Sequence, residues 1–106
     1  APDGTPSADE EMFGPAANLW CVESLDEAIH RANDSVFGLG SCIFTQNQDE
    51  IDRAINHLDA GATFVNAMVA SDPRLPFGGI KQSGYGRELS SEGILAFMNH
   101  KTIYIA

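Results

Sequence analysis

Residues 24–65 read SLDEAIHRANDSVFGLGSCIFTQNQDEIDRAINHLDAGATFV, and helix and strand patterns alternate along this stretch. Apolar residues recur at helical spacing in two places, at Leu25, Ala28, Ile29 and Ala32 and again at Ile51, Ala54, Ile55 and Leu58. Short apolar segments at 41–45 and 62–65 follow the two helical patterns and are typical of strands. The alternation predicts an α/β fold.

Polar residues mark where each of these helices begins. Ser24 and Glu27 have the S-x-x-E spacing in which two side chains cap a helix start reciprocally, so a helix is predicted over 25–33. Asn47 is placed to cap the second helix, Glu50 follows three residues later, and Gly61 suits the end of that helix. Both helices are therefore predicted to lead directly into the apolar segment that follows.

Upstream of this stretch, residues 16–22 read AANLWCV, a short apolar segment that predicts a mostly buried strand. The order then becomes strand, helix, strand, helix, strand with short links, which favours parallel pairing through right-handed crossovers. The segment FGLG at 37–40 is predicted to turn the chain, and residues 1–10 to form an irregular lead-in rich in Pro, Gly, Ser and Asp.

Downstream, the segment LPFGGIKQSGYGRE at 75–88 has four glycines, at positions 78, 79, 84 and 86. Glycine permits positive φ angles and close backbone approach, so tight packing is predicted here. The segment contains neither the G-x-G-x-x-G nor the G-x-x-x-x-G-K-[ST] pattern of phosphate-binding loops. Together with Lys81 and Arg87, this loop is either an anion site or a structural turn, and the turn is favoured.

The carboxyl-terminal residues predict one more helix and one more strand. The helix is expected around 89–98, with Ile94, Phe97 and Met98 facing inward, and the strand is KTIYIA at 101–106. Because this strand follows a helix and not a hairpin turn, no local strand completes its hydrogen-bonding ladder. It either joins the chain's own sheet or pairs with another subunit.

The composition bounds the class of protein. A chain of 106 residues provides one domain or part of one, and its net charge of −9 with only six Lys and Arg argues against binding nucleic acid. Residues 1–60 hold twelve acids and two basic residues, whereas residues 61–106 hold three acids and four basic residues, so any anionic ligand is expected in the second half. Without a membrane-spanning apolar run or a secretory signal, a cytoplasmic location is expected.

The two cysteines, Cys21 and Cys42, lie in apolar segments without a C-x-x-C or His-flanked pattern. Both are predicted to be small buried core residues, and neither a metal site nor a redox site is expected. A disulfide is not expected either, because nothing in the sequence points to secretion.

Four segments resemble successive landmarks of the aldehyde dehydrogenase superfamily: EEMFGP at 10–15, AN-x-x-x-x-GL at 32–39, AGATFVN at 60–66 and PFGGIKQSGYGRE at 76–88. Their order and spacing match too, and ASDPRLPFGG at 70–79 resembles the succinate-semialdehyde dehydrogenase branch. The resemblance implies that residues 1–100 form the C-terminal part of the catalytic domain, a β-α-β-α-β unit with a mainly parallel sheet. It also implies that residues 101–106 form an oligomerisation strand exchanged between the protomers of a homo-oligomer.

The resemblance further implies a reaction. In that family a cysteine thiolate attacks the aldehyde, hydride leaves to NAD or NADP, and a glutamate activates the water that releases the acid from the thioester. Both catalytic residues are expected upstream of this chain, since Cys21 and Cys42 lie on predicted strands and no ELGG-type glutamate motif occurs. The chain alone is therefore expected to be inactive and to depend on the remainder of the enzyme chain.

Two residues of EEMFGP resemble cofactor-binding positions of the family. Glu11 resembles the glutamate that hydrogen-bonds the nicotinamide ribose, where one carboxylate accepts from both hydroxyls. Phe13 resembles the aromatic residue that packs beside the nicotinamide ring. From the residues alone, Glu11 is a solvated acid and Phe13 a core aromatic.

The loop before the glycine-rich segment resembles the substrate side of the family's active site. Phe77 resembles the aromatic wall of the aldehyde tunnel, and Ser71 falls where the residue type tunes substrate choice. Arg74 provides a positive charge for a substrate carboxylate, or is simply a surface residue. Three residues of the glycine-rich segment resemble structural positions: Lys81, Ser83 and Arg87.

The resemblance thus implies an NAD(P)-dependent aldehyde dehydrogenase that acts on a small aldehyde such as succinate semialdehyde. The alternative, from the residues alone, is a non-catalytic α/β binding or interaction module whose terminal strand makes a dimer.

Overall fold

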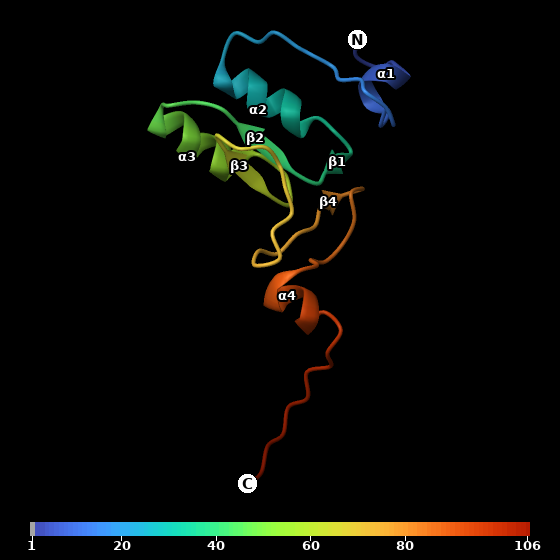
Figure 1. Cartoon of the computed structure of the whole chain (residues 1–106), viewed down its shortest axis with the longest axis vertical. Helices are drawn as coiled ribbons and strands as arrows, with labels where there is room; N and C mark the ends of the chain where they lie inside the picture. The colour runs from blue at the N-terminus through green and yellow to red at the C-terminus, as the bar shows by residue number, and fades with distance from the viewer. Residues whose placement is uncertain (1) are drawn as a thin grey trace.

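The computed structural model describes residues 2–106, which form an elongated molecule of 62 × 34 × 25 Å (Figure 1). The elements follow in the order α1 (Pro6–Asp9), α2 (Leu25–Asn33), β1 (Phe37–Gly38), β2 (Ser41–Ile43), α3 (Gln48–His57), β3 (Thr63–Val65), β4 (Ile80–Lys81) and α4 (Ser90–Leu95). Helices α2 and α3 lie side by side next to β2 and β3, and α4 lies further along the long axis. This alternation of helices and strands confirms the α/β class.

The segment β2-α3-β3 is a parallel crossover unit, as predicted for residues 41–65. Ser41 pairs with Thr63 and Ile43 pairs with Val65, and the hydroxyls of Ser41 and Thr63 are 2.9 Å apart. Helix α3 contacts both β3 and α2. Its residue Ala54 is fully buried, so the core of this unit lies beneath α3.

Both helices begin at their predicted caps, although one reciprocal partner differs. The Ser24 hydroxyl accepts a hydrogen bond from the Glu27 N–H at 3.2 Å, but the Glu27 carboxylate accepts from the Glu23 N–H at 2.9 Å and not from Ser24. The Asn47 side chain accepts from the Asp49 N–H at 2.9 Å. Each cap supplies an acceptor for an N–H that the helix itself leaves unpaired.

The predicted strand at 16–22 is wrong. These residues form no strand, because no other described segment of the chain hydrogen-bonds alongside them. Leu19 is 88% exposed, so the apolar character of the segment does not bury it within residues 2–106. The predicted lead-in at 1–10 is also only partly irregular: residues 6–9 form α1, with Pro6 in the first turn, where its missing N–H costs nothing.

The predicted turn at 37–40 contains β1, which pairs antiparallel with β4. Phe37 lies opposite Lys81, and Gly38 lies opposite Ile80. The strands therefore form two separate two-stranded sheets, one antiparallel and one parallel, and not a single mainly parallel sheet. Glycine is needed at position 38, because an added Cβ would lie 2.7 Å from Ile80 Cγ1 and 3.0 Å from the carbonyl oxygen of Asp59.

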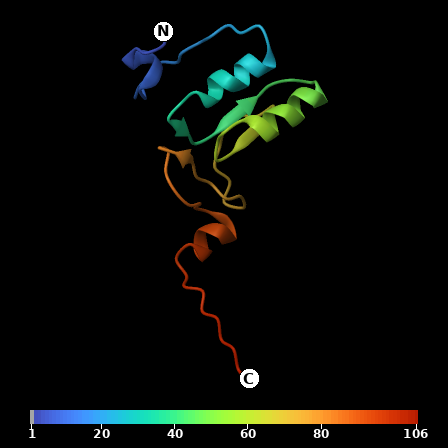
Figure 2. The same ribbon diagram turned by 180° about the vertical axis from the view of Figure 1, so that it is seen from behind.

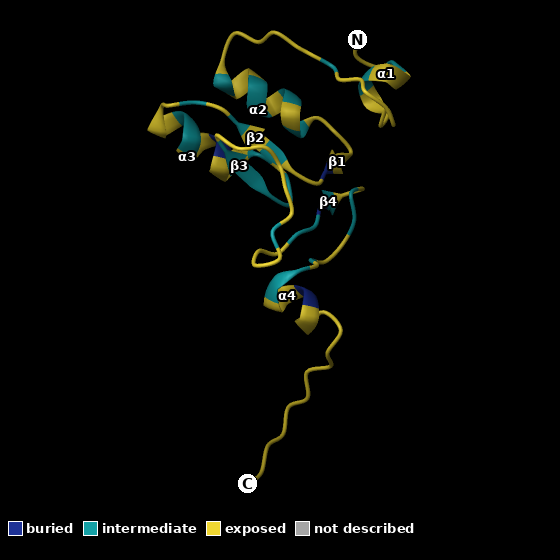
Figure 3. Cartoon of the chain, viewed as in Figure 1, coloured by how far each residue is buried: buried dark blue, intermediate teal, exposed yellow. Residues whose placement is uncertain are grey.

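The predicted carboxyl-terminal helix is wrong in its length and in the direction of its apolar side chains, and the predicted strand at 101–106 has no partner among the described residues. Helix α4 spans only six residues, and Ile94, Phe97 and Met98 are 69%, 95% and 57% exposed and so do not face inward. Residues 101–106 form no strand with any described part of the chain and extend away from the body (Figure 3). In both places the apolar side chains have no described element to pack against.

The two cysteines are also placed differently from the prediction. Cys21 and Cys42 are exposed free thiols and not buried core residues. Residues 2–106 contain no cluster of three or more His, Cys, Asp or Glu side chains arranged to hold a metal ion. In the same range, no helix has the length and apolar character required to cross a membrane.

Candidate functional site

The glycine-rich loop packs directly against the chain that follows α3. A Cβ added to Gly61 would lie 1.7 Å from the carbonyl oxygen of Gly78 and 3.0 Å from the Cα of Gly79, so the two backbones touch where side chains would collide. Gly61 therefore does not serve as the predicted helix stop, since α3 already ends at His57. Its role is close backbone approach.

Hydrogen bonds close this loop at its base and across its middle. The main chains of Phe77 and Glu88 exchange two bonds of 2.8 and 2.7 Å, and the Ser83 hydroxyl accepts from the Gly38 N–H at 2.9 Å. The Arg87 guanidinium donates to the carbonyl of Gly79 at 2.9 Å. Half-buried Phe77 is thereby fixed where the loop starts.

The two cations of this loop are engaged by carbonyl oxygens. Arg87 donates to carbonyls within the loop, and Lys81 Nζ donates to the carbonyl of Asn33, at the end of α2, at 2.8 Å. These contacts favour the structural turn over the anion site, and they match the structural roles predicted for Lys81, Ser83 and Arg87.

The loop before Phe77 carries a local ion pair that sequence reasoning missed. Arg74 donates from Nη2 to Asp72 at 2.6 Å and from its backbone N–H at 2.9 Å. The Arg74 side chain is 85% exposed, and that of Asp72 is 30% exposed. The side-chain hydrogen bond, followed by the backbone hydrogen bond, lowers the pKa of Asp72, and the same pair raises the pKa of Arg74. Ser71 is exposed beside them.

The two predicted cofactor residues lie on a different segment. Glu11 and Phe13 follow α1 in a segment without regular secondary structure. Phe13 is 94% exposed, so the interpretation of Phe13 as a core aromatic is wrong. Both views place this segment near α1, and the loop between β3 and β4 nearer α4 (Figure 2). The segment that carries the candidate cofactor residues and the loop that carries the candidate substrate residues thus lie in different parts of the described chain.

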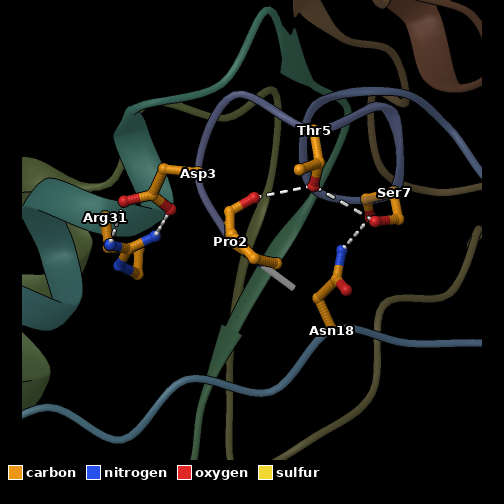
Figure 4. A network of polar contacts seen from close by, with 6 residues as sticks. All are labelled: Pro2, Asp3, Thr5, Ser7, Asn18 and Arg31. Atoms are coloured by element: carbon orange, nitrogen blue, oxygen red, sulfur yellow. Dashed lines mark hydrogen bonds and ion pairs between the residues drawn. The ribbon is translucent and has the colours of Figure 1, made fainter.

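The amino-terminal segment is tied to α2 by contacts that the sequence pattern does not reveal. Arg31 donates to both carboxylate oxygens of Asp3, at 2.8 and 3.1 Å (Figure 4). Arg31 also lies 5.2 Å from the centre of the Trp20 ring. The Asn18 side chain donates to the Ser7 carbonyl at 2.6 Å. The hydrogen bond from Arg31 lowers the pKa of Asp3. Asp3, Trp20 and Arg31 border a cleft of about 850 Å³, between this segment and the end of α2.

Asn33 of the AN-x-x-x-x-GL segment joins the ends of α2 and α3. Its side-chain amide donates to the His57 carbonyl at 2.7 Å and accepts from the Asp59 N–H at 2.8 Å. A single asparagine therefore satisfies one donor and one acceptor where α3 ends. The sequence pattern singled out Asn33 only as a landmark and did not indicate these partners.

Comparisons with known proteins give a consistent picture. The family model described as Aldehyde dehydrogenase family matches residues 1–103. A curated relative from Synechocystis, named probable succinate-semialdehyde dehydrogenase [NADP(+)], is 50% identical over 99% of this chain and 23% of its own length. Its counterpart from Mycobacterium leprae is 53% identical over 92% of this chain and 21% of its own length. The chain therefore spans about a fifth of the length of these relatives.

Solved structures agree with the sequence relatives. A succinic semialdehyde dehydrogenase from Streptococcus pyogenes, in complex with NADP+, superposes with a TM-score of 0.92 at 45% identity, over 99% of this chain and 23% of that one. A betaine aldehyde dehydrogenase from Staphylococcus aureus, in complex with NAD+, gives a TM-score of 0.80 at 38% identity, over 84% of this chain and 18% of that one.

Proposed function

Because the chain belongs to the aldehyde dehydrogenase family, we propose that the enzyme carrying it oxidises succinate semialdehyde to succinate with NADP+ as the electron acceptor. The observation that carries this proposal is the 50% identity to a named succinate-semialdehyde dehydrogenase over 105 residues. Within the enzyme, residues 1–100 are assigned to the C-terminal part of the catalytic domain and residues 101–106 to an oligomerisation strand.

The proposed substrate site uses the loop between β3 and β4. Phe77, held by the two backbone bonds to Glu88, provides a fixed aromatic wall for the aldehyde. Ser71 and Arg74 provide a hydroxyl and a guanidinium for the distant carboxylate of succinate semialdehyde. Since Arg74 already pairs with Asp72, the substrate carboxylate has to share the guanidinium with that carboxylate.

The proposed cofactor contacts are Glu11 and Phe13. Both side chains are exposed, so a carboxylate acceptor and an aromatic face are open to a ligand that carries ribose hydroxyls and a flat ring. When bound, the nicotinamide accepts the hydride from the substrate carbon. The contribution of this chain is then to orient the ribose and to limit the motion of the ring.

The nucleophile of the proposed reaction is a cysteine outside this chain. Neither Cys21 nor Cys42 is assigned that role, because neither lies in a segment that resembles the family's catalytic loop. We expect the purified chain of 106 residues to form no NADPH from succinate semialdehyde. Sustained turnover by a mass-verified sample would contradict the assignment of the nucleophile.

The substrate proposal is tested in the complete enzyme with succinate semialdehyde and with butanal, which has the same carbon chain but no carboxylate. Combining Ser71→Ala with Arg74→Ala should raise KM for succinate semialdehyde roughly tenfold or more, because charge-assisted hydrogen bonds are lost. KM for butanal should change little. The matched control is Arg53→Ala, which removes an exposed arginine that pairs with Asp26. Equal changes for both aldehydes, or a parent enzyme that prefers butanal, would reject the proposal.

A further inference from the structure

Asn66 occupies the position where the chain leaves the parallel sheet. It follows β3 directly, and its backbone N–H donates to the Ile43 carbonyl at 2.8 Å, so it still belongs to the ladder with β2. Its φ of 53° lies in the left-handed region, which turns the chain out of the strand. Asparagine tolerates this region better than most residues other than glycine.

The Asn66 side chain then replaces the main chain that has turned away. Its Oδ1 accepts from the Thr45 N–H at 3.0 Å, and its Nδ2 donates to the Thr45 carbonyl at 2.9 Å. A primary amide presents the same donor and acceptor as a peptide group. The Thr45 backbone therefore stays paired on both of its polar groups, although β3 has ended.

Thr45 is itself tied to the start of α3. Its hydroxyl hydrogen-bonds the Glu50 carboxylate and accepts from the Asn47 N–H at 3.1 Å. The chain running from Asn66 is thus connected through Thr45 to the first turn of α3. These hydrogen bonds join the start of the 67–76 loop to the β2-α3-β3 unit.

The same loop ends at a second anchor, the bridge between Phe77 and Glu88. Ser71 and Arg74 lie between the two anchors, where the loop is also held by a hydrogen bond of 3.0 Å from the Ser90 N–H, at the start of α4, to the Pro73 carbonyl. We infer that Asn66 is a positioning residue, which sets the direction in which the 67–76 loop departs and so places Ser71 and Arg74 for the substrate carboxylate. This inference rests on the proposed function and assigns a determinant of its specificity.

Three substitutions in the complete enzyme separate the hydrogen bonds from the backbone angle. Asn66→Gly keeps the left-handed φ and removes the amide, whereas Asn66→Asp keeps the size and places an oxygen against the Thr45 carbonyl. Asn66→Ala removes the amide and also strains the backbone. The matched control is Asn56→Ala, which removes an exposed asparagine whose amide donates to Asp52 within α3.

For Asn66→Gly and Asn66→Asp, KM for succinate semialdehyde should rise roughly tenfold, because displaced Ser71 and Arg74 side chains lose hydrogen bonds to the substrate carboxylate. KM for butanal and the Kd for NADP+ should stay within about twofold of the parent enzyme, a change equivalent to well under 1 kcal/mol. Hydrogen–deuterium exchange over residues 67–76 should become faster in the Asp variant and stay unchanged in the Asn56→Ala control.

Each other outcome decides against the inference. Equal KM changes for both aldehydes, or unchanged exchange in the loop, would make Asn66 a residue without a role in substrate placement. Loss of NADP+ binding in all three variants would make its role purely structural. The preference of the parent enzyme for succinate semialdehyde over butanal is measured first. If the parent enzyme shows no such preference, the proposed function fails, independently of the Asn66 variants.

Discussion

At the scale of single residues, the ion pair between Asp72 and Arg74 changes the pKa of a carboxyl in the loop between β3 and β4. The guanidinium donates to both carboxylate oxygens of Asp72 and, with the backbone N–H of Arg74, surrounds them with donors. Because both side chains contact solvent, this pair contributes little to stability, as exposed ion pairs generally do. The pair instead lowers the pKa of the Asp72 carboxyl, and it partly neutralises the positive charge that Arg74 presents to a ligand.

We expect Arg74→Ala to raise the pKa of Asp72 toward its ordinary value of 3.8, because the largest cause of the lowering is the Arg74 side chain. The pKa of Asp72 is lowered in the folded chain, so the pair stabilises the fold above the unfolded pKa, and that contribution disappears as the pH falls through the lowered value. An NMR titration of the Asp72 carboxyl carbon measures the change. Arg74→Lys, which keeps the charge, should restore part of the lowering, and an unaltered titration in Arg74→Ala would contradict the pairing.

At the scale of elements, the contact between Gly61 and Gly78 joins the β2-α3-β3 unit to the segment that leads to β4. The contact lets the loop leading to β4 cross the end of the β2-α3-β3 unit at van der Waals distance, with no side chain between. Neither glycine can be replaced there without moving backbone, which is rigid compared with the end of a side chain.

We expect Gly61→Ala to destabilise the enzyme by roughly 1–3 kcal/mol or more, the usual cost of overpacking, and to lower its thermal midpoint. The control is Gly14→Ala, where an added Cβ meets nothing within 4 Å. Scanning fluorimetry of both variants at one heating rate measures the difference. If the two midpoints agree, the close approach of the backbones is not what the structure describes.

Prediction from sequence succeeded where the information is local. Apolar spacing and capping residues identified α2 and α3, and the apolar segments after them identified β2 and β3, because each signal lies within a few residues. Pairing of β1 with β4 depends on segments far apart in the chain, so no local pattern indicated it. The strand predicted at 16–22 failed for the complementary reason: an apolar segment becomes a strand only when a neighbour pairs with it.

The candidate site was only partly visible in the sequence. Family resemblance singled out Ser71, Arg74 and Phe77, and their roles in binding stay predictions. The partners that hold them, such as Asp72 for Arg74 and Glu88 for Phe77, are set by side-chain geometry and backbone pairing. A motif specifies residue types at a spacing, but not the direction in which each side chain points.

At the scale of the whole molecule, apolar surface faces outward in unusual amount. Ala54 is the fully buried hydrophobic residue of residues 2–106, whereas Ile94, Phe97, Ile103 and Tyr104 are mostly exposed. Exposed apolar surface in this amount is typical of regions that bind another protein, a membrane or a ligand. The resemblance assigns the terminal part of this surface to contact between protomers, and that assignment stays a prediction.

We expect deletion of residues 101–106 from the complete enzyme to reduce its assembly, because the segment has no pairing partner within the described chain and needs one elsewhere. Ile103→Pro should act in the same direction by removing a ladder donor, whereas Ile103→Val should keep the assembly. Light scattering at equal concentration measures the mass. An unchanged mass for both the deletion and the proline variant would show that the segment does not join subunits.

The stacking of Arg31 on Trp20 also makes the amino-terminal segment observable by light. Trp20 is the one tryptophan in the sequence, and its ring lies where α2 meets the segment tied down by Asp3. Indole emission shifts in wavelength and intensity when a neighbouring cation or water shell changes. Release of that segment from α2, whether by salt, acid or a ligand in the adjoining cleft, therefore produces an intrinsic fluorescence signal from this chain without any added dye.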